Sequence, residues 1–129
     1  IFIYIIVSIM DSVQILKTDI SVTNIDEVSR ILIGEKEVLI AICNANTLVQ
    51  CYKNVKLNKL INSFTIKCPD GFPVAKSSRL LYKNNQKRVD GYKLFLKTLE
   101  FGLSNNTSHY FYGNNEFVTK KMIKEIKKL

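Results

Sequence analysis

The chain has 129 residues, of which 47% are hydrophobic and 23% charged, a composition that excludes a disordered protein and suits one globular domain with a real core. Lysine and arginine outnumber aspartate and glutamate by 19 to 11, which gives a formal charge of +8. A surplus of this size favours a polyanionic partner, such as nucleic acid, an anionic lipid surface or a phosphorylated small molecule, and does not choose among them.

Residues 1–9, IFIYIIVSI, form an apolar segment that is shorter than the roughly twenty residues of a spanning helix. The segment also lacks the basic start and the cleavage site of a signal peptide. Met10 is a plausible natural start, so we treat residues 1–9 as either an upstream extension or the tail of a preceding segment. Residues 10–129 are predicted to form a single α/β domain.

The sequence of the first part of this domain predicts one or two strands, then a helix, then another strand. Residues 13–22 are β-branched and partly alternating, which indicates one or two short strands. Asn24, with Glu27 three residues later, is a helix N-cap signal, and apolar residues at helical spacing then run to Gly34. Residues 37–43 are a continuous apolar run, typical of a strand with both faces covered.

The remainder continues this alternation. We predict helices over 44–54, 55–62, 73–81 and 90–103, strands over 63–68 and 108–113, a loop over 82–87, and a last helix from Asn114 or Asn115 to residue 129. The order indicates a layered, Rossmann-like α/β domain with a mostly parallel sheet flanked by helices. Such sheets bind ligands at the carboxyl ends of their strands, which here are Asn44, Asp70 and Gly113.

The three cysteines indicate a reducing compartment. Cys43, Cys51 and Cys68 form no Cys-x-x-Cys pair and lie in or beside apolar runs, where a thiol behaves as a small hydrophobe. The single histidine, His109, is distant in sequence, so the closely spaced ligands of a zinc site are missing. We therefore predict neither a metal nor a cofactor.

Asp70 is the strongest candidate for chemistry. It follows a predicted strand and lies between Pro69 and Gly71, where the proline stiffens the loop and the glycine allows a substrate to approach the backbone. A carboxylate at a strand end can act as a general base on a hydroxyl group. Arg88 could pair with a phosphate or orient this carboxylate. Spacing alone, however, favours an ordinary turn.

Two further positions indicate structure more than chemistry. His109 falls in the predicted strand 108–113, where a packed or half-exposed imidazole is the favoured interpretation. The sequence Gly113-Asn114-Asn115 stands at a strand-to-helix junction, where backbone amides could meet a phosphate. A glycine turn with an asparagine cap explains it more simply.

The stretch CPDGFPVAKSSRLL, followed by KRVDGYKLF, resembles the central signature of the WecG/TagA/CpsF bacterial glycosyltransferases. That signature is an Asp-Gly-x-Pro stretch after a strand and an Arg-Val-x-Gly element that opens a helix. The upstream ICNANTLVQC is similar to the family's Thr-x-Asn strand end, and YFYGNNEFV is similar to its later strand, glycine turn and helix. Order and spacing agree from about Val13 to Leu129.

The resemblance implies a reaction. Members transfer an N-acetylhexosamine, often N-acetylmannosamine, from a UDP-sugar to a polyprenyl-diphosphate-linked sugar during synthesis of cell-surface polysaccharide or teichoic-acid linkage units. They invert the anomeric centre and are not known for needing a metal. The expected location is cytoplasmic, peripheral to the inner face of the cell membrane, and a homo-oligomer is one assembly to consider.

The resemblance also implies site residues. Carried over by position, Asp70 is the general base, Asn44 lines the pocket, and Gly71, Arg88 and Gly91 lie at the substrates.

The sequence departs from the family pattern at several points. Ile42 stands where threonine is common, and Lys93 stands where an aspartate usually follows the Arg-Val-x-Gly glycine. The chain ends after a helix that falls near the middle of a typical member, so we expect the N-terminal portion of such an enzyme. Two alternatives stay open: a basic α/β module that binds nucleic acid, against which the dispersed lysines count mildly, and a truncated, inactive relative.

Overall fold

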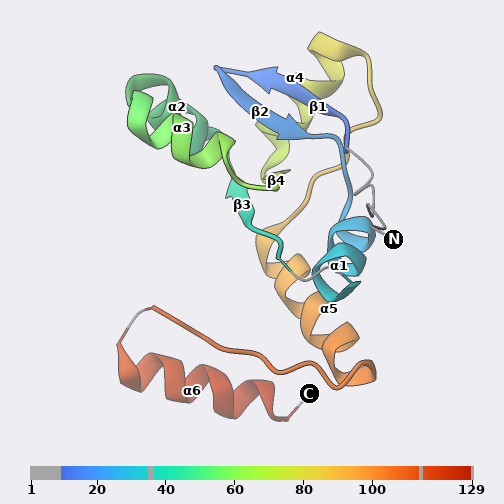
Figure 1. Ribbon diagram of the computed structural model, residues 1–129, viewed down its shortest axis with the longest axis vertical. Coiled ribbons are helices and arrows are strands. Elements are labelled where there is room, and N and C mark those ends of the chain that lie inside the picture. The colour runs from blue at the N-terminus through green and yellow to red at the C-terminus, as the bar shows by residue number, and fades with distance from the viewer. Residues whose placement is uncertain (1–9, 35–36, 114, 129) are drawn as a thin grey trace, which may run out of the picture.

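The computed structural model describes residues 10–34, 37–113 and 115–128 (Figure 1). The expected extension at residues 1–9 lies outside this part. In chain order the elements are β1 (Ser12–Ile15), β2 (Thr18–Ser21), α1 (Ile25–Gly34), β3 (Ile40–Cys43), α2 (Ala45–Lys53), α3 (Val55–Asn62), β4 (Ile66–Pro69), α4 (Phe72–Tyr82), α5 (Gly91–Ser104) and α6 (Glu116–Ile126).

The strands form two small sheets, of which one is parallel. β1 and β2 make an antiparallel hairpin, because the two residues that join them, Leu16 and Lys17, allow only a tight turn, and both have positive φ. β3 and β4 pair in parallel, with Cys43 opposite Pro69. The α/β class is confirmed. Of the two sheets among the described residues one is parallel and one is antiparallel, so the expected layered, Rossmann-like domain with a mostly parallel sheet is not confirmed.

β4 lies between β3 and the hairpin. On one edge, the backbone amide of Asp70 donates a hydrogen bond of 2.9 Å to the carbonyl of Cys43. On the other edge, the amide of Lys67 donates to Ser21 Oγ at 3.1 Å, which holds β2 beside β4 through a side chain. Figure 1 shows the hairpin and β4 next to one another. The end of β4 is therefore supported from both sides.

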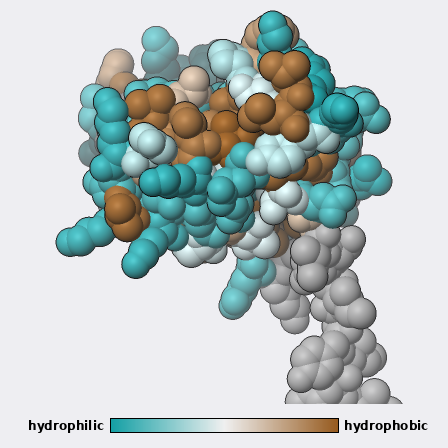
Figure 2. Space-filling view, turned by 90° about the horizontal axis from the view of Figure 1, so that it is seen from above, coloured by the Kyte–Doolittle hydropathy of each residue, from teal (hydrophilic) through white to brown (hydrophobic). Residues whose placement is uncertain are grey.

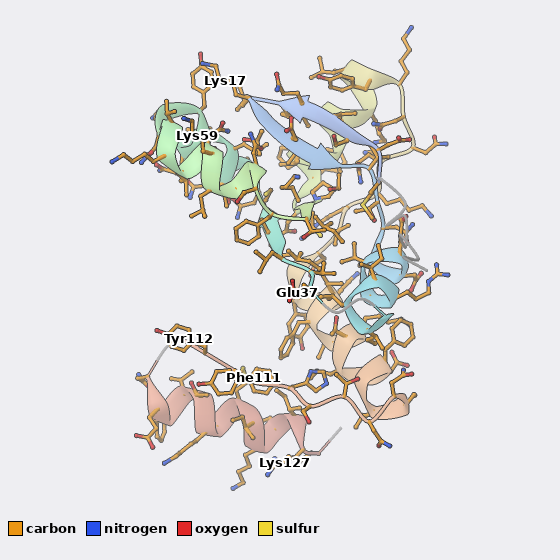
Figure 3. All side chains as sticks on the ribbon, in the orientation of Figure 1. Lys17, Glu37, Lys59, Phe111, Tyr112 and Lys127 are labelled. Atoms are coloured by element: carbon orange, nitrogen blue, oxygen red, sulfur yellow. The ribbon has the colours of Figure 1, made fainter. Side chains whose placement is uncertain are left out.

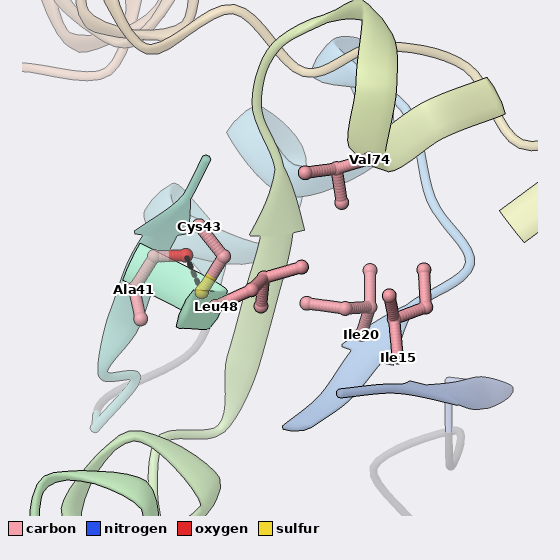
Figure 4. Packing of buried hydrophobic residues seen from close by; sticks show 6 residues of the cluster. All are labelled: Ile15, Ile20, Ala41, Cys43, Leu48 and Val74. Atoms are coloured by element: carbon pink, nitrogen blue, oxygen red, sulfur yellow. Dashed lines mark hydrogen bonds between the residues drawn. The ribbon is translucent and has the colours of Figure 1, made fainter. Parts of the chain in front are cut away.

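Buried hydrophobic residues form two clusters around this strand pair. The hairpin, β3, α2 and α4 contribute the first cluster, drawn in Figure 4: Ile15, Ile20, Ala41, Cys43, Leu48 and Val74. The second cluster joins α1, β4, α5 and the segment before α5: Val28, Ile66, Cys68, Val89 and Leu94. α1 and α5 pack against each other, as Figure 1 shows. Both β3 and β4 are therefore held by buried hydrophobic packing up to their carboxyl ends.

Asparagine side chains start several of the helices and explain their boundaries. Asn24 Oδ1 accepts the backbone amide of Glu27 at 3.1 Å, as the sequence predicts. Asn54 is both the C-cap of α2 and the N-cap of α3, and its Oδ1 accepts a hydrogen bond from the amide of Leu57 at 3.0 Å. This second cap divides the helical pattern that the sequence shows over 44–54 and 55–62 into two helices.

The expected strand over 108–113 is wrong. This segment has no strand pairing, and Figure 3 shows it leaving the C-terminal end of α5 and running alongside α6. Its contacts are aromatic: the ring of Phe111 meets the ring of Phe95 edge-on at 5.9 Å, and His109 stacks on Phe111 at 6.5 Å. Tyr110 and Tyr112 point into solvent. A β-rich sequence forms a strand only beside a partner, and α5 offers none.

Candidate functional site

Asp70 and Asn44 occupy the carboxyl ends of the two parallel strands. Cys43 and Pro69 are register partners, so the residues that follow them leave the sheet side by side. The hydrogen bond from the Asp70 amide to the Cys43 carbonyl fixes this placement. The Asp70 side chain is 22% exposed, so its carboxylate is held by the protein yet open to solvent on one side. The sequence analysis places both residues at strand ends, and the structure brings these two ends together.

Asn44 has a structural duty at this position. Its Oδ1 accepts hydrogen bonds from the backbone amide and the hydroxyl of Thr47, at 3.0 and 3.2 Å. The side chain thus caps the N-terminus of α2, which satisfies amide groups that a helix start leaves unpaired. Capping holds the asparagine in one orientation at the strand end.

Gly71 provides the turn from β4 into α4. Its backbone has φ +83° and ψ 148°, a conformation essentially confined to glycine. No side chain caps α4, and a proline lies in its first turn, where the missing N–H costs nothing. The sequence pair Asp-Gly therefore has a local cause: the chain must reverse immediately after the carboxylate. The amide end of α4 opens beside Asp70.

Arg88 joins Asp70 to a second carboxylate. Its Nε lies 3.4 Å from Asp70 Oδ1, and its Nη2 lies 2.7 Å from Asp90 Oδ2. The Arg88 side chain is 53% exposed, so it stays available to a ligand on its solvent side. The segment that carries Arg88 is held against β4, because the Val89 amide donates to the Pro69 carbonyl at 2.9 Å. The geometry brings Arg88 to Asp70, which is one of the two roles that the sequence analysis left open for this arginine.

Asp90 is a site residue that the sequence reasoning missed. It is the N-cap of α5, and its Oδ1 accepts the backbone amide of Lys93 at 3.0 Å. This backbone hydrogen bond, together with the nearby charge of Arg88, holds the pKa of the Asp90 carboxyl below its usual value. Asp90 therefore stays ionised and anchors the arginine. Its signal in the sequence was an aspartate at the first position of the helix predicted over 90–103, whereas the structure starts the helix at Gly91 and makes Asp90 its cap.

Gly91 lies against the end of β3. A Cβ at this position would stand 3.3 Å from Ile42 Cγ2, tighter than a usual contact. Glycine therefore lets the first turn of α5 approach β3 closely. Ile42, which stands where the pattern noted in the sequence analysis commonly has threonine, faces this glycine directly. The segment from Arg88 to Gly91 thus closes one side of the strand ends.

The other sequence candidates lie away from this group. His109 is exposed beside Gly102 of α5, and Gly113 has a positive φ of 122° shortly before α6. The segment 107–113, α5 and α6 enclose two hollows of about 430 and 530 Å³, and neither is lined by Asp70, Asn44 or Arg88. The residues predicted for Asp70 chemistry gather at the strand ends, and His109 and Gly113 do not join them.

The three cysteines are free and buried, and burial raises the pKa of the Cys43 thiol to about 11 and that of Cys68 to about 12. Among residues 10–34, 37–113 and 115–128, no group of three or more His, Cys, Asp or Glu is placed to hold a metal ion. None of the helices described is long and apolar enough to cross a bilayer.

This arrangement can do definite chemistry. A carboxylate oxygen of Asp70 can accept a proton from a hydroxyl group brought to the strand ends, because it is fixed by the backbone and partly exposed. The exposed guanidinium of Arg88 can donate hydrogen bonds to an anion. The two groups touch, so one ligand could meet both.

Comparison with known proteins assigns the chain to a family. No curated protein gives a significant match. A family model, described as the glycosyl transferase WecG/TagA/CpsF family, matches residues 13–129. The match includes both strand ends and the segment from Arg88 to Gly91. The chain therefore belongs to the WecG/TagA/CpsF family of glycosyltransferases.

Proposed function

We propose that this protein transfers an N-acetylhexosamine, of the N-acetylmannosamine type, from a UDP-sugar to a polyprenyl-diphosphate-linked sugar, with inversion at the anomeric carbon. The observation that carries the proposal is the position of Asp70 at the carboxyl end of β4, next to Asn44 and within 3.4 Å of Arg88. Family membership supports transfer of a sugar between a donor and an acceptor. The identities of both substrates are part of the proposal.

In the proposed step, Asp70 is the general base. The acceptor hydroxyl oxygen forms a bond to the anomeric carbon, the bond from that carbon to the diphosphate oxygen breaks, and UDP departs with the electron pair. The hydroxyl proton moves to a carboxylate oxygen of Asp70. A direct displacement of this kind inverts the anomeric centre.

The remaining residues orient the base and the substrates. Arg88 positions the Asp70 carboxylate and meets substrate anions with the exposed part of its guanidinium. Gly71 lets the chain reverse directly after the carboxylate, and Gly91 lets the first turn of α5 approach β3 closely. Asn44, which caps α2, lies at the strand end next to Asp70, and we assign it a contact with the substrates from there. The finer architecture we propose is a Rossmann-like layered sheet in which β3 and β4 are the parallel pair.

Charge suits the proposed substrates. Both the donor and the acceptor carry a diphosphate, and the formal charge of +8 favours binding of such anions. Amides and basic side chains can stabilise the charge that develops on the departing UDP. We propose a cytoplasmic protein that is peripheral to the inner face of the cell membrane, where a lipid-linked acceptor resides.

The test is a transfer assay on the full-length gene product. UDP-N-acetylmannosamine and a short-chain lipid-diphosphate acceptor should give UDP and an extended acceptor, and UDP release should require the acceptor. Asp70→Asn should abolish turnover, whereas Asp19→Asn, a neutral control on β2, should retain it. Turnover retained in Asp70→Asn would remove the general-base role, and no transfer in the wild type to any such acceptor would remove the proposed reaction.

A further inference from the structure

Charge is distributed unevenly along the chain. Residues 40–89 contain nine lysine and arginine residues and a single acidic residue, Asp70. The helices α2, α3 and α4 all lie in this stretch, and none of them carries an aspartate or glutamate. The only acidic residue in this stretch is therefore the proposed base.

The same elements expose large apolar side chains. Exposed fractions reach 62% and 75% for Phe72 and Leu80 on α4, and 53% for Tyr52 on α2. Val49 on α2 and Leu16 in the hairpin turn are also exposed. Figure 2 looks onto the end of the molecule that carries these elements and shows hydrophobic side chains gathered among hydrophilic ones. We call these five residues, with Lys17, Lys76 and Arg79, the docking face.

Contacts tie the apolar and basic members of the docking face together. The ammonium of Lys17 lies 4.9 Å from the ring centre of Tyr52, and that of Lys76 lies 5.6 Å from the ring centre of Phe72.

Shallow hollows join the three elements into one surface. A hollow of about 110 Å³ is lined by the hairpin turn, α2 and the first turns of α4, including Leu16, Val49 and Ser77. A second hollow is lined by four members of the docking face on α4: Phe72, Lys76, Arg79 and Leu80.

We propose that the docking face binds an anionic lipid bilayer. A surface that mixes lysine and arginine with aromatic and aliphatic side chains suits the boundary between lipid headgroups and acyl chains. Each cation near an anionic membrane strengthens binding roughly fivefold. Nucleic acid would use the cations but gains little from exposed aliphatic side chains such as Leu16 and Leu80.

The docking face also adjoins the proposed active site. Phe72 is separated from Asp70 by Gly71 alone, and α2 begins directly after Asn44. Docking would therefore bring the strand ends to the membrane that holds the acceptor. The inference rests on the proposed function in this respect, since only a lipid-linked acceptor gives docking a purpose in catalysis.

The experiment measures partitioning of the full-length protein onto vesicles by flotation. Vesicles of phosphatidylcholine and phosphatidylglycerol in equal parts should bind the wild type, and vesicles of phosphatidylcholine alone should bind it weakly. The double variant K76E/L80S alters two exposed members of the docking face and should lower the partition coefficient by about tenfold or more. The matched control L103S/K124E makes the same chemical changes on α5 and α6 and should bind like the wild type.

Several outcomes would overturn the inference. The first two are failure of the wild type to bind the mixed vesicles and an equal fall of the partition coefficient in both double variants. The other two are displacement of the protein from the vesicles by an oligonucleotide and a dimer, seen by light scattering, that K76E/L80S abolishes. Activity toward a water-soluble acceptor separates the two proposals. K76E/L80S should retain this activity, because neither residue belongs to the proposed active site. If the wild type shows no activity toward the soluble acceptor while K76E/L80S still loses vesicle binding, the transfer reaction is refuted and docking is supported.

Discussion

Replacement of Gly71 by alanine should destabilise the protein through the backbone. A Cβ at this position would meet nothing closer than Pro73 Cδ at 3.7 Å, which is an ordinary contact. The cost therefore comes from forcing a side-chain-bearing residue to adopt φ +83° and ψ 148°, about 1–3 kcal/mol. Lower entropy of the unfolded chain offsets about 0.4–1 kcal/mol of this loss. We expect a net decrease of about 1–2 kcal/mol in the free energy of unfolding.

The assay is equilibrium unfolding in denaturant, supported by thermal melting. A loss of 1 kcal/mol lowers the melting temperature of a domain this size by roughly 4 °C. Gly34→Ala is the matched control, because a Cβ there would meet no atom within 4 Å and Gly34 ends a helix without a positive φ. That variant should be as stable as the wild type or more stable. If Gly71→Ala unfolds at the wild-type denaturant concentration, the argument from backbone conformation is refuted.

Three further predictions concern charge, thiols and packing. Asp90→Asn removes a carboxylate whose pKa is lowered mainly by the hydrogen bond from the Lys93 amide. The wild type should therefore be more stable than the variant above pH 3.8 and should lose this advantage as the pH falls below 3.8. Unfolding measured across pH checks this, and a stability difference that does not change with pH would contradict it. Thiol-specific reagents at pH 8 should leave Cys43 and Cys68 unmodified until the protein unfolds, because their raised pKa values keep them protonated; rapid labelling of the native protein would contradict this. Leu48→Ala should lower the free energy of unfolding by about 2–5 kcal/mol, since this side chain is 2% exposed in the first cluster; a loss below 1 kcal/mol would show loose packing.

Local signals in the sequence were sufficient for most helices. Asn24 and Asn115 each precede an apolar pattern of helical spacing, and both cap a helix in the structure. The position of Asp70 was also predictable, because a buried run that meets Pro69 and Gly71 must end there. Parallel pairing of β3 and β4 then follows from the helices between them, and it places Asn44 beside Asp70.

The misses arose where long-range contacts decide the structure. The sequence over 108–113 has strand character, yet the chain that reaches Phe111 finds the ring of Phe95 on a helix instead of a strand edge. Asp90 was overlooked because its role depends on Arg88, which could have turned toward either neighbouring carboxylate and in the structure binds both Asp70 and Asp90. Spacing along the chain does not determine such a shared contact.

The single-turnover rate of Asp70→Asn tests the central claim most directly. The amide keeps the shape of the carboxylate, which lies at the end of β4 with its backbone bonded to Cys43, but it does not accept the acceptor proton. With donor and acceptor bound in advance, rapid-quench measurement should show bond formation slowed by about 100- to 10,000-fold, while affinity for the donor is unchanged. A rate within about threefold of the wild type would contradict the proposal that Asp70 is the base.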